Sequence, residues 1–70
     1  MTAVSTRALM ERLVSTEEAA RLLGLAPKTL REWERTGAGP IKGWRVRIGG
    51  GAVQLRWDLL EIEGLLVPRD

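Results

Sequence analysis

A chain of 70 residues suffices for one small domain, which buries only about 60% of its unfolded surface and leaves little room for a deep enzyme pocket. Cysteine and histidine are absent, which removes disulfides, thiolate metal sites, the usual general base and the usual metal ligand. We therefore expect no enzyme activity, metal or cofactor. The apolar runs are only a few residues long and no secretory signal is present, which predicts a soluble, cytoplasmic protein without membrane contacts.

Positive charge is concentrated in one part of the chain. The formal net charge is only +2, but residues 37–57 contain no acidic residue and four basic ones: Lys42, Arg45, Arg47 and Arg56. Residues 58–70 are acidic on balance. A localised basic stripe on a small domain is typical of nucleic-acid binding, and double-stranded DNA is the partner that it predicts.

The first helix signal lies near residue 15. Residues 1–12 fit either a flexible arm or a short helix, and the pattern does not choose between them. Ser15 and Glu18 then form a capping box, in which Ser15 begins a helix and Glu18 reaches back to its amide. Gly24 is suited to end that helix.

A second helix follows almost at once. Pro27 fits its first turn, and Gly37 stops it after about Thr36. Two helices joined by so short a turn predict a helix-turn-helix. On the second helix, Leu30, Trp33 and Gly37 form the face expected to be buried. The opposite face carries Lys28, Arg31, Glu32 and Arg35.

Residues 44–57, WRVRIGGGAVQLRW, predict a β-hairpin with a loop over residues 49–52. That loop sets a register whose apolar face pairs Ile48 with Val53, Val46 with Leu55 and Trp44 with Trp57. The same register puts Arg47 opposite Gln54 and Arg45 opposite Arg56 on the other face. Two arginines that face each other repel, which indicates an anionic partner on that face.

The last element expected is a helix within DLLEIEGLL, with Leu59, Ile62 and Leu66 on one side and acidic residues on the other. The predicted fold is mainly α with a small β-hairpin, a winged helix-turn-helix over residues 13–67, followed by a tail at 68–70. The apolar side of the third helix also fits a docking surface for a partner protein.

The segment STEEAARLLGLAPKTLREWERTGAGP resembles the excisionase-like, MerR-like DNA-binding domains. That family shares the pattern Glu-Ala-Ala, Leu-Gly, Thr-Leu, Trp and Gly-x-Gly-Pro, followed by a basic wing and an Asp-Leu helix start. The resemblance covers residues 13–66 and implies that residues 27–36 are a recognition helix and residues 44–57 its wing. The family includes phage excisionases, small transcription regulators and the DNA-binding end of phage small terminase subunits. The three glycines make this wing longer and looser than a tight family turn.

Together, the residue patterns and the resemblance predict a sequence-specific, double-stranded DNA-binding protein. The biological role that we predict is that of an excisionase-like recombination directionality factor. Such a protein is a monomer in solution that assembles cooperatively on DNA and bends it, and its protein partner is an integrase or other recombinase. A small transcription regulator and a terminase-type DNA-recognition or adaptor domain are the alternatives. Predicted contacts of the recognition helix are Lys28, Thr29, Arg31, Glu32 and Arg35. Predicted contacts of the wing are Lys42, Arg45, Arg47, Gln54 and Arg56.

Two other interpretations of the motifs are weaker. The three glycines lack the Lys-Ser/Thr and the following helix of a phosphate-binding loop. Trp33, Trp44 and Trp57 would suit stacking on unpaired bases, but their predicted inward faces favour a place in the core.

Overall fold

Four helices and a three-stranded antiparallel sheet make up residues 5–67, the part of the chain that the computed structural model describes. In chain order they are α1 (Thr6–Arg12), β1 (Leu13–Ser15), α2 (Thr16–Leu23), α3 (Pro27–Thr36), β2 (Trp44–Gly49), β3 (Ala52–Asp58) and α4 (Leu59–Glu63). The predicted arm is a short helix from Thr6 on, and its first four residues and the predicted tail at 68–70 lie outside the described range. Within that range, no helix has the length and apolar character needed to cross a membrane.

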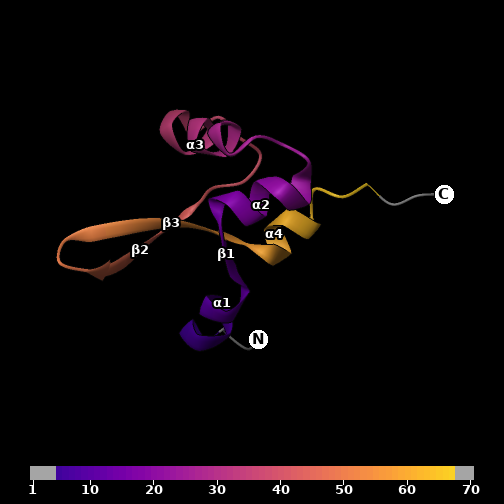
Figure 1. The fold of residues 1–70 in the computed structure, drawn as a ribbon. Coiled ribbons are helices and arrows are strands. Elements are labelled where there is room, and N and C mark those ends of the chain that lie inside the picture. The colour runs from indigo at the N-terminus through magenta and orange to yellow at the C-terminus, as the bar shows by residue number, and fades with distance from the viewer. Residues whose placement is uncertain (1–4, 68–70) are drawn as a thin grey trace.

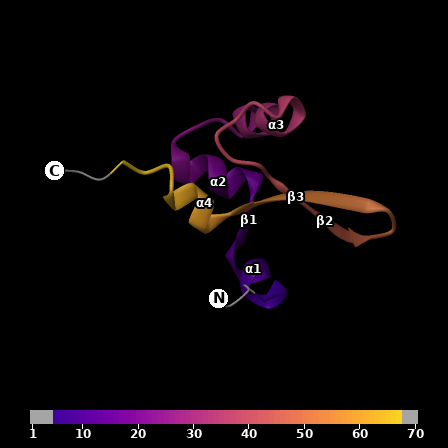
Figure 2. The ribbon, with the colours of Figure 1, turned by 180° about the vertical axis from the view of Figure 1, so that it is seen from behind.

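The β2–β3 hairpin lies between two helices: α3 is on one side of it and α1 is on the other, as Figures 1 and 2 both show. The hairpin extends beyond the helices, and α4 with residues 64–67 lies at the opposite end of the molecule (Figure 1).

Helix boundaries follow their local signals. Ser15 Oγ accepts from the Glu18 amide at 3.0 Å, which confirms Ser15 as the N-cap of α2. The other half of the predicted capping box is wrong, because the Glu18 carboxylate pairs with Arg21 one turn later. Gly24 and Gly37 end α2 and α3 with φ of 70° and 71°, a backbone region that glycine enters without steric cost.

The predicted register of the hairpin is wrong: none of its five predicted residue pairs forms, and the turn has two residues instead of the predicted four. Gly49 pairs with Ala52 across a two-residue turn, Gly50 and Gly51, whose φ values of 55° and 79° suit a type I′ turn. A bulge between Arg47 and Gly49 then shifts the pairing by one residue. Below the bulge, the partners are Arg47 with Val53, Val46 with Gln54, Arg45 with Leu55, and Trp44 with Arg56.

This shift moves the arginines to different faces. Arg45 and Arg47 share the face of Leu55 and Trp57, which is turned toward α2 and α3, whereas Arg56 lies on the other face. The predicted opposition of Arg45 and Arg56 is therefore wrong, and so is the argument from their repulsion.

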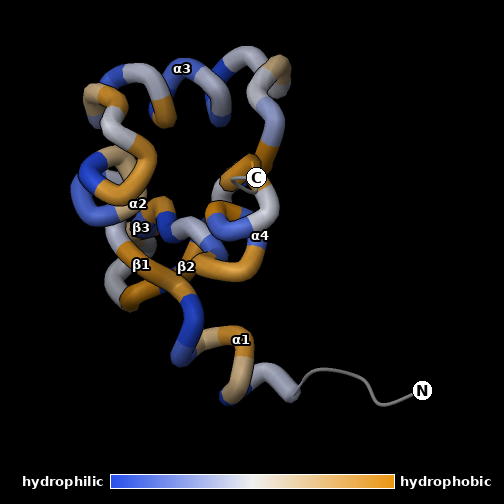
Figure 3. The backbone as a smooth tube through the Cα atoms, turned by 90° about the vertical axis from the view of Figure 1, so that its right-hand side faces the viewer, coloured by the Kyte–Doolittle hydropathy of each residue, from blue (hydrophilic) through white to orange (hydrophobic). Residues whose placement is uncertain are grey.

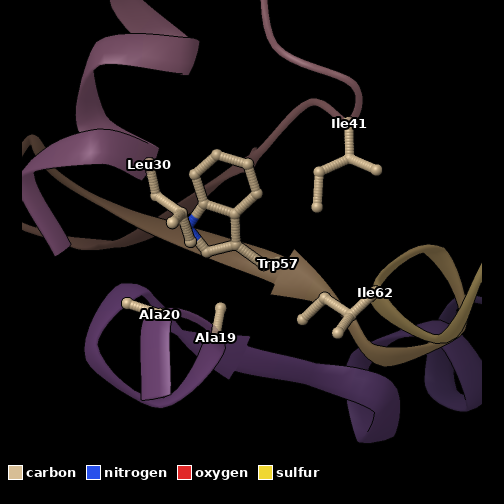
Figure 4. Packing of buried hydrophobic residues seen from close by; sticks show 6 residues of the cluster. All are labelled: Ala19, Ala20, Leu30, Ile41, Trp57 and Ile62. Carbon is tan, nitrogen blue, oxygen red and sulfur yellow. The ribbon is translucent and has the colours of Figure 1, made fainter. Parts of the chain in front are cut away.

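The core forms where α2, α3, α4 and β3 meet. Its fully or nearly buried apolar residues are Ala19, Ala20, Leu30, Ile41, Trp57 and Ile62 (Figure 4). Trp57 is the centre of this cluster: its Nε1 donates to Thr16 Oγ1 at 3.0 Å, and the Trp33 ring meets it edge-on with centroids 6.4 Å apart. Trp33 and Trp57 thus take the predicted core role.

Several residues predicted on inward faces are exposed. They include Gly37, at the end of α3, and Ile48 and Val53, which lie beside the hairpin turn. Trp44 is 43% exposed, since the shifted register turns it away from Trp57. Leu66 is 64% exposed, because α4 ends at Glu63, well short of the predicted helix. Gly64 follows directly, and glycine is a poor helix former.

Two links between elements were not predicted. β1 adds a third strand by pairing antiparallel with β3, Leu13 opposite Asp58 and Ser15 opposite Arg56. Arg12, at the end of α1, donates from Nε and Nη2 to the two Asp58 carboxylate oxygens at 3.1 and 2.9 Å. Asp58 also caps α4 by accepting from the Leu60 amide at 2.9 Å, so one nearly buried carboxylate joins α1, β3 and α4.

Candidate nucleic-acid interface

The outer face of α3 is polar and exposed along its length. Lys28, Arg31, Glu32 and Arg35 are exposed, as expected, while Leu30 is buried on the opposite side. Figure 3 shows the largely hydrophilic helix at the outer edge of the molecule. Thr29, also a predicted contact, is half-buried, so it lies at the margin of this face.

The cations of α3 are mostly paired. Arg35 pairs with Glu32 on the same helix, with its Nε 3.3 Å from Glu32 Oε2. The hydrogen bonds from Arg35 lower the pKa of the Glu32 carboxyl, so Glu32 remains charged at neutral pH. Because the two side chains hold each other, this ion pair competes both with the predicted phosphate contact of Arg35 and with the predicted base contact of Glu32.

Arg31 has a partner on another helix. Its Nη2 donates to Glu17 Oε2 on α2 at 2.6 Å. Lys28 makes no ion pair with any residue of the 5–67 range. Within α3, therefore, Lys28 presents an uncompensated charge, and Arg31 and Arg35 present charges shared with carboxylates.

The predicted wing, residues 44–57, lies in the β2–β3 hairpin and divides its polar residues between two faces. Arg45 and Arg47 lie on the face toward α3, and Arg45 Nε donates to Glu34 Oε2 of α3 at 3.0 Å. On the other face, Arg56 donates from Nε and Nη2 to Gln54 Oε1 at 3.0 and 2.6 Å. Neither Arg47 nor Arg56 has a carboxylate partner among the residues described.

Two glycines between α3 and β2 set the position of the wing. A Cβ at Gly39 would lie 2.3 Å from Trp33 Cγ, and one at Gly43 would lie 2.5 Å from Leu55 Cδ1. With Ile41 buried between them, this segment packs directly onto the core. The base of the wing is thereby held at a defined place relative to α3, and the exposed Lys42 lies on the same connecting segment.

The predicted residues are thus brought together in part. Lys28, Arg31 and Arg35 share the outer surface of α3. Glu34, on the half-buried flank of the same helix, holds Arg45 of the wing face that also carries Arg47. Gln54 and Arg56 lie on the other wing face. Glu17 and Glu34 were not predicted as site residues. No local signal identifies them, because their partners are 14 and 11 residues away in the sequence.

Comparison with known proteins adds no assignment: no family model, no curated protein and no solved structure matches this chain.

Proposed function

We propose that this chain is a sequence-specific, double-stranded DNA-binding protein of the winged helix-turn-helix class, with α3 as recognition helix and β2–β3 as wing. The observation that carries the proposal is the Arg45–Glu34 contact, which ties α3, through a half-buried glutamate on its flank, to the wing face that bears Arg45 and Arg47. A DNA duplex presents phosphates beside its major groove, so a helix and an adjacent arginine-bearing hairpin can contact both at once.

The size of α3 supports its proposed place in the groove. An α-helix with its side chains is about 10–12 Å across, so the major groove, about 12 Å wide, accepts one helix; the ten residues of α3 extend about 15 Å along it. Lys28 and Arg31 then lie near base edges, where bidentate donation from arginine to guanine is the commonest specific contact. We expect phosphate contacts from Arg35, near the end of α3, from Arg47 and, on the far wing face, from Arg56.

Replacing Arg45, Arg47 and Arg56 together by alanine should weaken binding to all duplex sequences alike. The slope of log Kd against log salt should fall by about 0.9 for each phosphate that the variant no longer neutralises, because fewer counterions are released. The three side chains are exposed or half-buried and none belongs to the hydrophobic core, so the fold should remain. The measurement is a salt titration of DNA affinity by fluorescence anisotropy.

Arg7→Ala provides the control. Arg7 is highly exposed and lies on α1, on the opposite side of the hairpin from α3, so its loss should leave the salt slope nearly unchanged. An Arg45/Arg47/Arg56 triple variant with the affinity and salt slope of the parent would show that the wing does not contact DNA.

Within this class we propose the role of an excisionase-like recombination directionality factor. A single helix and wing bury only about 600–1,000 Å² on DNA, so one copy binds weakly and several adjacent copies are needed for occupancy. The charge distribution suits such a row: the basic wing and the α4 end, with Glu61 and the exposed Glu63, lie at opposite ends of the molecule (Figure 2). A row of copies would bend or stiffen DNA and so favour excision by an integrase.

Sedimentation and footprinting during a DNA titration test this role. We expect a monomer in the absence of DNA and stepwise, cooperative loading on a repeated site. A stable dimer that forms without DNA and occupies one palindromic operator would contradict the directionality role and favour a small transcription regulator.

A further inference from the structure

The ion pair between Arg31 and Glu17 is unlike the other pair on the outer face of α3. Arg35 is held by Glu32 of its own helix, whereas Arg31 is held by a residue of α2, with Nη2 and Oε2 2.6 Å apart. Both side chains are more than half exposed, 57% for Arg31 and 65% for Glu17, so a ligand on this surface reaches them directly. Glu17 makes no other side-chain hydrogen bond within residues 5–67.

We infer that Glu17 is a specificity-determining residue of the DNA-binding surface, which favours guanine over phosphate as the DNA partner of Arg31. This inference rests on the proposed DNA-binding function and names the residue that separates correct from incorrect sites. Glu17 acts on DNA through Arg31: it positions the Arg31 side chain and thereby selects its DNA partner.

The selection follows from the number of donors on arginine. A guanidinium carries five N–H donors, and the bond to Glu17 occupies one of them. Guanine presents two acceptors, O6 and N7, which the remaining donors can meet while Glu17 still holds the side chain in place. At a correct site, Arg31 therefore gains two bonds without losing its partner, and little side-chain freedom is left to lose.

At an incorrect site, which lacks the guanine, phosphate is the DNA partner left for Arg31, and Glu17 weakens that contact. If Arg31 turns to a phosphate, it exchanges one anion for another and leaves Glu17 unpaired near the negatively charged backbone. If Arg31 stays with Glu17, its charge is already shared and attracts phosphate less strongly. In both cases Glu17 weakens binding to non-specific DNA more than binding to the correct site, which widens the ratio of the two affinities.

The test compares affinities for two defined duplexes. The first is selected from a random duplex pool with the unaltered full chain, and the second is a scrambled duplex of the same composition. Kd is measured for the parent, Glu17→Gln, Arg31→Ala, the double variant and Glu63→Gln. Glu63 is the matched control, because it is an exposed glutamate on α4 and its replacement changes the net charge equally.

We expect Glu17→Gln to narrow the ratio of specific to scrambled affinity about 3- to 5-fold, mainly through tighter binding to the scrambled duplex. Glu63→Gln should change both affinities by the same factor and keep the ratio. In the Arg31→Ala background, Glu17→Gln should no longer alter the ratio, because the side chain through which Glu17 acts is gone.

The inference is overturned if Glu17→Gln keeps the parental ratio, or if it narrows the ratio equally with and without Arg31. Those outcomes leave the proposed function intact, provided that the parent enriches a preferred duplex from the pool. A parent chain that binds no duplex, or binds all duplexes equally, overturns the proposed sequence-specific function and this inference with it.

Discussion

Trp57→Ala is expected to unfold the protein or leave it barely folded. The indole is fully buried, touches α2, α3 and α4, and donates to Thr16, so its removal leaves a cavity and an unpaired hydroxyl. Truncation of a buried aromatic costs about 3–5 kcal/mol, whereas a domain of this length has about 4–10 kcal/mol in total. Urea unfolding followed by circular dichroism measures the loss.

Trp44→Ala is the matched control, because it also replaces a tryptophan by alanine. Trp44 is 43% exposed on the hairpin, so we expect its replacement to cost less than about 1 kcal/mol. Trp57→Phe should fall between the two, since it keeps a ring in the core but loses the hydrogen bond to Thr16. Equal unfolding midpoints for the Trp57→Ala and Trp44→Ala proteins would contradict the observed packing.

Asp58→Asn is expected to lower the free energy of unfolding by about 1–3 kcal/mol at neutral pH. The Asp58 side chain accepts two hydrogen bonds from Arg12 and one from the Leu60 amide, and the residue is only 5% exposed. Asparagine still caps α4, so the loss reports mainly the charged contact with Arg12.

The pH dependence of this loss follows from the pKa of Asp58. The hydrogen bonds from Arg12, and then that from the Leu60 amide, lower the pKa of the folded Asp58 carboxyl, although burial opposes the shift. A lowered folded-state pKa means stability that is fully present above the unfolded pKa, about 3.9, and lost as the pH falls through the folded value. The difference between parent and Asp58→Asn should therefore be constant from about pH 5 to 7 and shrink below about pH 4. A difference that stays constant down to about pH 2 would show that the charge of Asp58 does not stabilise the fold.

Much of the local structure could be predicted from short stretches of sequence. Ser15, Gly24, Pro27 and Gly37 mark the ends of α2 and α3 as expected. Caps are local because they depend on backbone groups within about four residues, and those groups need no tertiary partner. The exposed face of α3 was predicted for a similar reason, since the period of an α-helix alone decides which side chains share a face.

The position of the hairpin turn was likewise predictable from its glycines, but the length of the turn and the faces of the strands were not. Gly50 and Gly51 make the turn, as glycines with positive φ can. Whether Arg56 shares a face with Arg45 depends on the bulge between Arg47 and Gly49, which shifts the pairing of β2 with β3. It also depends on the pairing of β1 with β3, which fixes the strand that puts Trp57 in the core. No local rule specifies a bulge, and a shift of one residue exchanges the two faces of a strand.

Local signals were therefore enough to predict the order of helix, turn, helix and hairpin, the ends of α2 and α3, and the side of α3 that faces outward. Tertiary contacts were needed to put Trp57 rather than Trp44 in the core, Arg45 and Arg56 on opposite faces, and carboxylates beside Arg31 and Arg45. The difference is one of range, because caps and helical periodicity act within a few residues. Burial, strand register and the Glu17–Arg31 and Glu34–Arg45 pairs depend on contacts between elements that are distant in the chain.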